Sequence, residues 1–247
     1  MKSANRPTVA LLALVAALSF TVTGCRDTGT TEPTAELGPV LILGDDRTED
    51  SVSTILTAAG IPIRMGGPYW EYDGSGLADV SAVILLTGWE YFEDMPEAAQ
   101  HAIVAFVAGG GGLMTTEWML YNLHYQYGKQ DIVAAIAPAL YGDDYEYQGE
   151  HYSRLIAGHP VAQGLPQSFE TRPDWTSVVT MADPAPAKQA QVVFGGSVSG
   201  DAVIAGRHGE GRTVHWSMAG EYNGQDIWSV EVRQLLVNIA KYISKRS

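Results

Sequence analysis

Cysteine is almost absent from this sequence, since Cys25 is the only one among 247 residues. An intramolecular disulfide is therefore excluded, and no thiol remains beyond position 25 for nucleophilic catalysis or metal binding. Basic residues are also scarce: 15 Lys and Arg stand against 28 Asp and Glu, which gives a formal net charge of −13. A surface of this sign repels nucleic acid and anionic headgroups, so we expect no nucleic-acid or polyphosphate partner.

The N-terminal segment has the features of a secretion signal. Two basic residues precede an apolar run at residues 9–22, which is too short to cross a bilayer as a helix but suits the core of a signal peptide. The run ends in VTGC (residues 22–25), which resembles the bacterial lipobox. We therefore expect a signal peptide at residues 1–24 and a lipid anchor carrying palmitate at Cys25, as in an exported envelope lipoprotein. The alternative is an ordinary secreted protein in which Cys25 is incidental.

The segment that follows the lipobox predicts a flexible tether. Residues 25–38 are rich in Thr, Glu, Asp, Gly and Pro, which bury too little apolar area to offset the entropy of ordering the chain. Arg26 is not the Asp associated with inner-membrane retention, which favours the outer membrane in a host that has one. Cleavage would remove two basic residues and no acid, leaving 13 basic against 28 acidic residues and a charge of −15.

The remaining residues, 39–247, have the length and apolar content of one large domain. In its first half, apolar runs predict strands, and helical spacing of apolar residues predicts the helices between them. The predicted strands are residues 39–43, 61–65, 81–86 and 113–116. The predicted helices run from Thr48 or Asp50 to Gly60 and from Pro96 to the glycines at 109–112.

The second half is less regular at first and clearer toward the end. We predict one helix at about residues 130–140 and a closing helix at residues 228–244. Residues 190–194, 202–207 and 213–218 lie between glycine turns and predict an antiparallel extension of the sheet. The chain as a whole predicts an α/β fold: a three-layer, doubly wound, mostly parallel sheet with an antiparallel C-terminal extension.

Three motifs occur in an order that resembles a known family. They are VAFVAGGGGLM (104–114), HPVAQGLP (159–166) and GEGRTVHWS (209–217). The first is similar to the helix, glycine run and strand of class I glutamine amidotransferase-like domains, the flavodoxin-like group that includes trehalose-utilisation-type proteins. The resemblance covers about residues 39–247 and implies a flavodoxin-like fold. It supports the fold more than any activity, because the motifs are short and rich in glycine.

The chain departs from this family at the catalytic turn. Catalytic amidotransferases have a Cys on a strained turn after the strand that here is 113–116, whereas this chain reads TTEWM at 115–119. Without a thiol, glutamine hydrolysis through a thioester is excluded. Glu117 occupies the position of the nucleophile.

Acidic residues and one histidine follow the predicted strands at the carboxyl edge of the sheet, where open α/β folds bind their ligands. Glu117 is a candidate general base, with Glu221 and His124 as possible assistants, although an acid at a helix start also serves as an ordinary cap. No histidine pair has the spacing of a zinc site, and we expect no metal and no cofactor. We interpret His215 as a structural histidine inside a strand and His159 as part of a turn. The segment 195–200 predicts a hairpin turn rather than a serine nucleophile.

Aromatic and acidic residues are interleaved in three segments, YWEYD (69–73), WEYFED (89–94) and DDYEY (143–147). Aromatic faces stack on sugar CH groups, and carboxylates accept hydrogen bonds from sugar hydroxyls, so we expect a pocket for a glycan or a small polar ligand. The predicted ligand-binding residues are Trp118, Trp89, Glu90, Asp45, Asp46 and Tyr222.

Three functions remain open on the sequence alone. The first is a membrane-tethered binding domain without catalytic activity, and the second is a carboxylate- or metal-assisted hydrolase acting on carbohydrate. The third is a structural partner in an envelope protein complex, because tyrosine and tryptophan are also common at protein interfaces.

Overall fold

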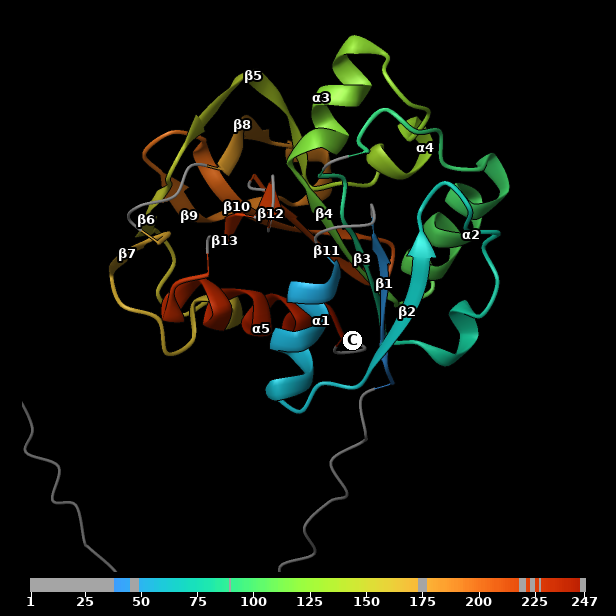
Figure 1. Cartoon of the computed structure of the whole chain (residues 1–247), viewed down its shortest axis with the longest axis horizontal. Helices are drawn as coiled ribbons and strands as arrows, with labels where there is room; N and C mark the ends of the chain where they lie inside the picture. Colours follow the sequence, from blue (N-terminus) through green and yellow to red (C-terminus); the bar gives the residue numbers. More distant parts are fainter. Residues whose placement is uncertain are drawn as a thin grey trace, which may run out of the picture. The chain divides into compact units, whose positions relative to one another are not determined.

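The computed structural model describes residues 38–44, 49–88, 90–172, 177–217, 221–222, 225–226 and 228–244 (Figure 1). For residues 117, 143–144, 147, 177–182, 221–222 and 225–226 it describes the backbone alone. The predicted signal peptide, Cys25 and the predicted tether lie outside the described residues. Within the described part of the chain, none of the helices combines the length and the apolar character that a membrane crossing requires.

A parallel sheet forms the first half of the domain. Its strands are β1 (Val40–Gly44), β2 (Ile63–Pro68), β3 (Ala82–Leu85) and β4 (Gly112–Thr116), in the order β2-β1-β3-β4. Every residue of β1, β3 and β4 is buried, because apolar side chains on both faces of these strands are covered. The four strands predicted from apolar runs are therefore confirmed, with shifts of at most three residues at their ends.

The sheet continues from β4 into an antiparallel half. β11 (Gly211–Trp216) pairs in parallel with β4, and antiparallel pairing then runs through β10 (Gly200–His208), β9 (Gln191–Gly196), β6 (His151–Arg154) and β7 (Ser168–Glu170). β5 (Ala139–Gln148) pairs with β8 (Ser177–Pro184), which meets β10 at Gly200. The short strands β12 (Glu221–Tyr222) and β13 (Gln225–Asp226) pair with each other. The predicted antiparallel extension is confirmed, and β11, its last strand along the chain, lies beside the parallel strands.

Helices cover both faces of the sheet (Figure 1). Val40 and Ile42 of β1 pack in one core cluster with α1 (Glu49–Ala58) and α5 (Val230–Ser244). Leu41 and Leu43 point to the opposite face and share a second cluster with α2 (Glu97–Ala108) and α4 (Asp131–Ala134). The alternation follows from the two-residue period of a strand. The remaining helix, α3 (Glu117–Tyr125), starts directly after β4.

The prediction of one helix at residues 130–140 is wrong. The structure has a single short turn of helix, α4, and the extended strand β5 begins at Ala139. Pro138 accounts for the difference, because a proline inside a helix lacks the N–H that the helix requires and disfavours helical conformation in the preceding residue. Short 3₁₀ turns, η1 (Leu77–Asp79), η2 (Pro160–Ala162) and η3 (Pro186–Lys188), complete the described elements.

Candidate ligand-binding site

The carboxyl ends of β3 and β4 are linked by hydrogen bonds between two threonines. The backbone N–H of Thr87 donates to Oγ1 of Thr116 at 3.1 Å, and the two hydroxyl oxygens lie 3.3 Å apart. Both side chains are buried. This pairing fixes the start of the loop that follows β3 next to the start of α3. Residues from the two segments therefore meet at the edge of the sheet where α/β folds place their ligands.

Aromatic side chains from this loop, from α3 and the turn after it, and from β5 gather into one cluster. We call it the tyrosine cluster, and it consists of Tyr91, Trp118, Tyr121, Tyr125, Tyr127, Tyr141 and Tyr145. Tyr121 lies at its centre, with ring centroids 4.9 Å from Trp118, 4.6 Å from Tyr125 and 5.5 Å from Tyr145. Most of these contacts are edge-on or tilted, the arrangements that aromatic quadrupoles favour.

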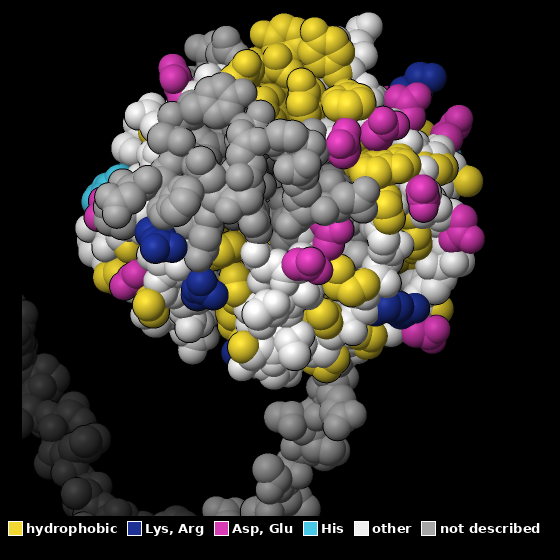
Figure 2. Space-filling model, in the orientation of Figure 1, with side chains coloured by type: hydrophobic (Ala, Val, Ile, Leu, Met, Phe, Trp, Pro, Cys, Tyr) yellow, Lys and Arg dark blue, Asp and Glu magenta, His cyan; other side chains and the backbone are white. Residues whose placement is uncertain are grey.

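The outer part of the tyrosine cluster is open to solvent. The side chains of Tyr125 and Tyr127 are 43% and 49% exposed, and Phe92 beside them is 52% exposed. Figure 2 shows hydrophobic side chains gathered at the top of the view, where Figure 1 places α3. A group of large aromatic residues that remain this exposed on one face is typical of a binding surface.

The hydroxyl group at the centre of the cluster stays neutral. Burial among the surrounding rings, followed by the phenol groups of Tyr145, Tyr125, Tyr127 and Tyr91, raises the pKa of Tyr121 to about 12. Its hydroxyl therefore keeps its proton at any physiological pH and can both donate and accept a hydrogen bond. The cluster thus combines apolar ring faces with a neutral hydroxyl group at Tyr121.

Trp118 lies beneath the surface of the cluster. Its side chain is 2% exposed and is covered by the ring of Tyr91, with centroids 4.7 Å apart and planes inclined by 20°. Among the described residues, the indole Nε1 has no hydrogen-bond partner, and neither does Oδ1 of Asn122 one helical turn further along α3. A buried polar atom without a partner costs about 1–3 kcal/mol. The predicted ligand residue Trp118 is thus at the site but closed off from solvent.

The loop that carries Tyr91 is held mainly by side chains. The hydroxyl of Tyr69 donates to the carbonyl oxygen of Glu90, and Nδ2 of Asn122 donates to the carbonyl oxygen of Tyr91. At the far end of the loop, the N–H of Lys129 donates to Asp94 at 2.7 Å, and Nζ of Lys129 lies 3.7 Å from the same carboxylate.

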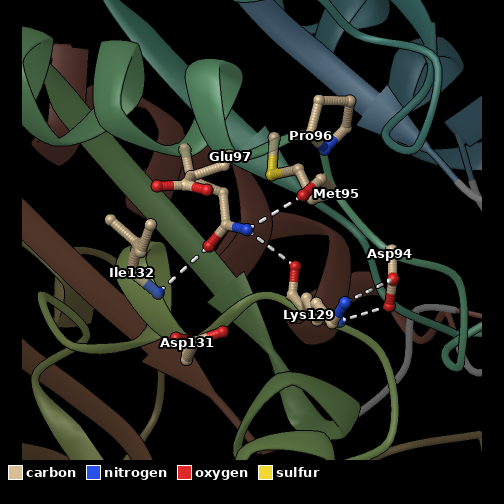
Figure 3. Close-up of a pocket in the computed structure, with 8 residues that line it drawn as sticks. Asp94, Met95, Pro96, Glu97, Lys129, Asp131 and Ile132 are labelled. Atoms are coloured by element: carbon tan, nitrogen blue, oxygen red, sulfur yellow. Dashed lines mark hydrogen bonds and ion pairs between the residues drawn. The ribbon is translucent and has the colours of Figure 1, made fainter.

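A cavity of about 460 Å³ lies at the end of this loop, between the start of α2 and α4 (Figure 3). It is lined by Asp94, Met95, Pro96, Glu97, Gln100, Lys129, Asp131 and Ile132. Gln100 is buried, and its Nε2 donates to the carbonyl oxygens of Met95 and Lys129, while its Oε1 accepts from the N–H groups of Ile132 and Val133. Because Gln100 uses its whole amide in these bonds, it fastens the loop to α4 rather than offering a free group to a ligand.

The sequence did not single out this cavity. The signal that points to it is a glutamine on the apolar stripe of the predicted helix that starts at Pro96, between Ala99 and Ile103. A buried glutamine on such a stripe requires polar partners from elsewhere in the fold.

The other predicted site residues are placed as follows. Asp45, Asp46 and Trp89 lie outside the described residues, and for Glu117, Glu221 and Tyr222 the structure describes the backbone alone. Glu117 is the first residue of α3, and Glu221 and Tyr222 form β12. Glu90 is half-buried in the loop beside Tyr91. His124 is exposed and stacks on Tyr141, with ring centroids 4.3 Å apart.

The structural roles predicted for three other segments are confirmed. Nδ1 of His159 accepts from the N–H of Val161 at 3.2 Å and so caps the turn η2. His215 is fully buried in β11 and shares a 3.0 Å hydrogen bond with Thr115. Residues 195–200 connect β9 to β10 as a hairpin, and the carboxyl group of Glu150 accepts hydrogen bonds from the N–H groups of Val198 and Ser199.

A search for metal-binding side chains and for a second cavity adds no residue to the tyrosine cluster. Among the described residues, no group of three or more His, Cys, Asp or Glu side chains is arranged to hold a metal ion. A smaller cavity of about 260 Å³ lies between α1 and the start of α5, lined by Asp50, Ser51, Thr54, Ile55, Trp228 and Arg233.

Comparison with known proteins provides information about the fold alone. No family model matches the sequence, and no curated protein matches it either. A ThuA-like protein from Bacteroides uniformis has a similar structure, with a TM-score of 0.63 and 16% identity over 85% of this chain and 92% of that one. A cytoplasmic protein from Salmonella typhimurium LT2 gives a TM-score of 0.64 and 14% identity over 84% of this chain and all of the other.

A β-galactosidase from Bacillus circulans contains a similar region, with a TM-score of 0.59 and 10% identity over 84% of this chain and 31% of the enzyme. At these identities the likeness shows the fold alone. The chain is therefore a mixed α/β domain whose fold is similar to that of ThuA-like proteins.

Proposed function

We propose that this chain is an exported lipoprotein, held to a membrane through Cys25, whose amidotransferase-like domain binds a neutral glycan. In this proposal the fold is the three-layer flavodoxin-like one, which the sheet order β2-β1-β3-β4 and the helices on both faces support. Binding requires no catalytic thiol, and the chain has none beyond Cys25.

The observation that carries the proposal is the tyrosine cluster at the carboxyl ends of β3 and β4. Rings stack on the CH faces of sugars, and neutral hydroxyls exchange hydrogen bonds with sugar hydroxyls. The acidic surface disfavours an anionic ligand, which makes a neutral glycan the better candidate.

The binding test targets Tyr125 and Tyr127, which form the exposed outer part of the tyrosine cluster. We expect Tyr125→Ala combined with Tyr127→Ala to weaken binding of cellotriose, maltotriose or chitobiose roughly 30-fold, since each stacked ring contributes about 1 kcal/mol. Binding is measured by calorimetry on the whole protein. Unchanged affinity in the double variant would remove the cluster from the binding surface.

A matched control is available on other elements. Met65 on β2 and Leu155 after β6 are 44% and 59% exposed, close to the exposure of the two tyrosines. Replacing both by Ala should leave sugar binding within twofold of the original protein. A second double variant, Tyr125→Phe with Tyr127→Phe, keeps the rings and removes the hydroxyls. The affinity that it loses measures the contribution of hydrogen bonding, and the remaining loss in the alanine variant measures stacking.

The anchor is tested independently of the ligand. We expect Cys25→Ser to move the protein from the membrane fraction to the soluble fraction of bacterial cells and to abolish labelling by radioactive palmitate. Palmitate incorporation that persists in this variant would contradict the proposed anchor.

A protein partner in the envelope is the second candidate, and one observation favours it. Leu123 on α3 and Leu140 on β5 are 43% and 53% exposed on elements that also carry the tyrosine cluster, and Phe92 is a third exposed apolar side chain. Aliphatic side chains suit a protein interface better than a sugar. If neutral sugars fail to bind while cross-linking from residue 123 captures one defined envelope protein, this candidate replaces the glycan.

A further inference from the structure

Two polar atoms of α3 are buried without a hydrogen-bond partner among the described residues. Trp118 and Asn122 are four residues apart, so their side chains occupy the same face of the helix one turn apart. Among the residues that the structure describes, the indole N–H donor and the amide oxygen acceptor lack a hydrogen bond. Both side chains are at least nine-tenths buried. A native fold normally provides partners for such atoms, and their absence points to a group that is not part of this conformation.

The chemistry of the missing partner can be deduced from the pair. A hydroxyl group accepts a hydrogen bond from an N–H and donates one to an amide oxygen at the same time. Neither Trp118 nor Asn122 carries a charge, so the pair offers no counter-ion to a charged ligand. A neutral polyhydroxylated molecule satisfies both atoms, and its ring can lie on the indole face.

That indole face is occupied by a ring of the protein itself. Tyr91 lies parallel to Trp118 at a centroid distance of 4.7 Å, which is the arrangement a stacked sugar ring would adopt. Tyr91 belongs to the loop after β3, and the next residue, Phe92, is 52% exposed. The loop is attached to α3 by the side chain of Asn122 and to the turn at Lys129 by the side chain of Asp94, and water can replace both of these contacts. One backbone hydrogen bond, from the N–H of Met95 to the carbonyl oxygen of Lys129 at 3.2 Å, holds the end of the loop.

We infer that Trp118 and Asn122 form a covered subsite for one neutral sugar ring, and that Tyr91 occupies the place of this ring until the loop opens. The inference deepens the proposed function, because it adds an inner subsite to the exposed tyrosine face. The inner subsite is regulated by competition, because the bound sugar and the ring of Tyr91 occupy the same face of the Trp118 indole. The apparent affinity of the protein is then lower than its intrinsic affinity by the fraction of molecules whose loop is open.

The competition gives Tyr91→Ala an effect opposite to that of an ordinary binding residue. Removing the competing ring should tighten binding of cellotriose, maltotriose or chitobiose about tenfold, measured by calorimetry. The gain should vanish when Trp118→Phe is added, because phenylalanine keeps a ring but lacks the N–H donor. Without any sugar, acrylamide should quench the fluorescence contributed by Trp118 more strongly in Tyr91→Ala than in the original protein.

A second variant loosens the loop without touching either ring. Asp94→Ala removes the 2.7 Å bond from the N–H of Lys129 and the ion pair with its ammonium group. It should tighten sugar binding about threefold, because the loop opens more often. Glu97→Ala is the matched control, because Glu97 is an exposed acid that lines the same cavity (Figure 3). Its carboxylate lies 3.6 Å from His101 on its own helix and does not hold the loop. It should leave the affinity unchanged.

The outcomes separate this inference from the proposed function. Tighter binding in Tyr91→Ala and Asp94→Ala supports the covered subsite, even if Tyr125→Ala with Tyr127→Ala has no effect and the exposed face is thereby refuted. Weaker or equal binding in Tyr91→Ala overturns the subsite, while loss in the tyrosine double variant still supports the exposed face. If neither the original protein nor the two loop variants binds any of the three sugars at millimolar concentration, both proposals are overturned.

Discussion

The buried histidine of β11 makes a specific prediction about stability and pH. His215 has no exposed surface, its Nδ1 shares a 3.0 Å hydrogen bond with Oγ1 of Thr115, and its Nε2 has no partner among the described residues. Burial lowers the pKa of His215 from 6.5 to about 3. The folded protein therefore holds this imidazole neutral over a range of pH in which the unfolded chain protonates it.

The sign and the size of the effect follow from this difference. Because the pKa of the folded state is the lower one, the stabilisation is fully present above pH 6.5 and is lost as the pH falls from 6.5 toward 3. Each pH unit within that window costs about 1.4 kcal/mol. Between pH 7 and pH 5, His215 alone should lower the free energy of unfolding by about 2 kcal/mol.

The assay is urea unfolding at pH 7 and at pH 5 for the original protein and for His215→Leu. The variant should lack about 2 kcal/mol of the pH dependence, which corresponds to a midpoint difference of about 1 M urea. Comparing the two proteins cancels the other shifted groups, including His159 and His208, whose pKa values burial also lowers. Thr115→Val should destabilise the protein equally at both pH values. Identical pH dependence in the original protein and His215→Leu would refute the reasoning.

Three further substitutions test the packing around the site, each by urea unfolding. Gln100→Leu should cost about 3 kcal/mol, because it leaves buried backbone groups on both sides of the cavity without partners, and an effect below 1 kcal/mol would contradict this. Gly112→Ala should destabilise by about 3 kcal/mol or prevent folding, since a Cβ there would lie 2.2 Å from the carbonyl oxygen of Ile243, whereas Gly158→Ala, in open space, should cost less than 1 kcal/mol. Glu150→Ala should cost about 2 kcal/mol and make the amides of Val198 and Ser199 exchange faster with solvent; unchanged exchange would show that the hairpin does not depend on Glu150.

The parallel half of the domain was predictable because its signals are local. A strand covered on both faces must be apolar throughout, and residues 39–43, 81–86 and 113–116 carry that pattern in the sequence itself. The closing helix α5 was equally clear, since its apolar stripe repeats at helical spacing over its whole length.

β5 was not predictable in the same way. Its residues mix acids, glycine and tyrosines without a regular alternation of polar and apolar groups, so no period-two hydrophobic pattern indicates a strand. The strand forms because its backbone pairs with β8, much further along the chain, and because Tyr141 and Tyr145 pack against Tyr121 of α3. Pairing over such a distance depends on the whole fold, which is why the middle of the chain was interpreted as irregular.

Residue types and their spacing are enough to predict the strands and helices of the parallel half, the lack of a catalytic thiol, and the position of Glu117 and Trp118 directly after β4. These features depend on residues within one segment, so they can be recognised without knowing which other segments they contact. Only the folded structure shows that Trp118 lies beneath Tyr91, that tyrosines from three segments meet around Tyr121, and that His215 is fully buried. Those outcomes depend on contacts between segments far apart in the chain, and burial is a property of such contacts rather than of the residue that is buried.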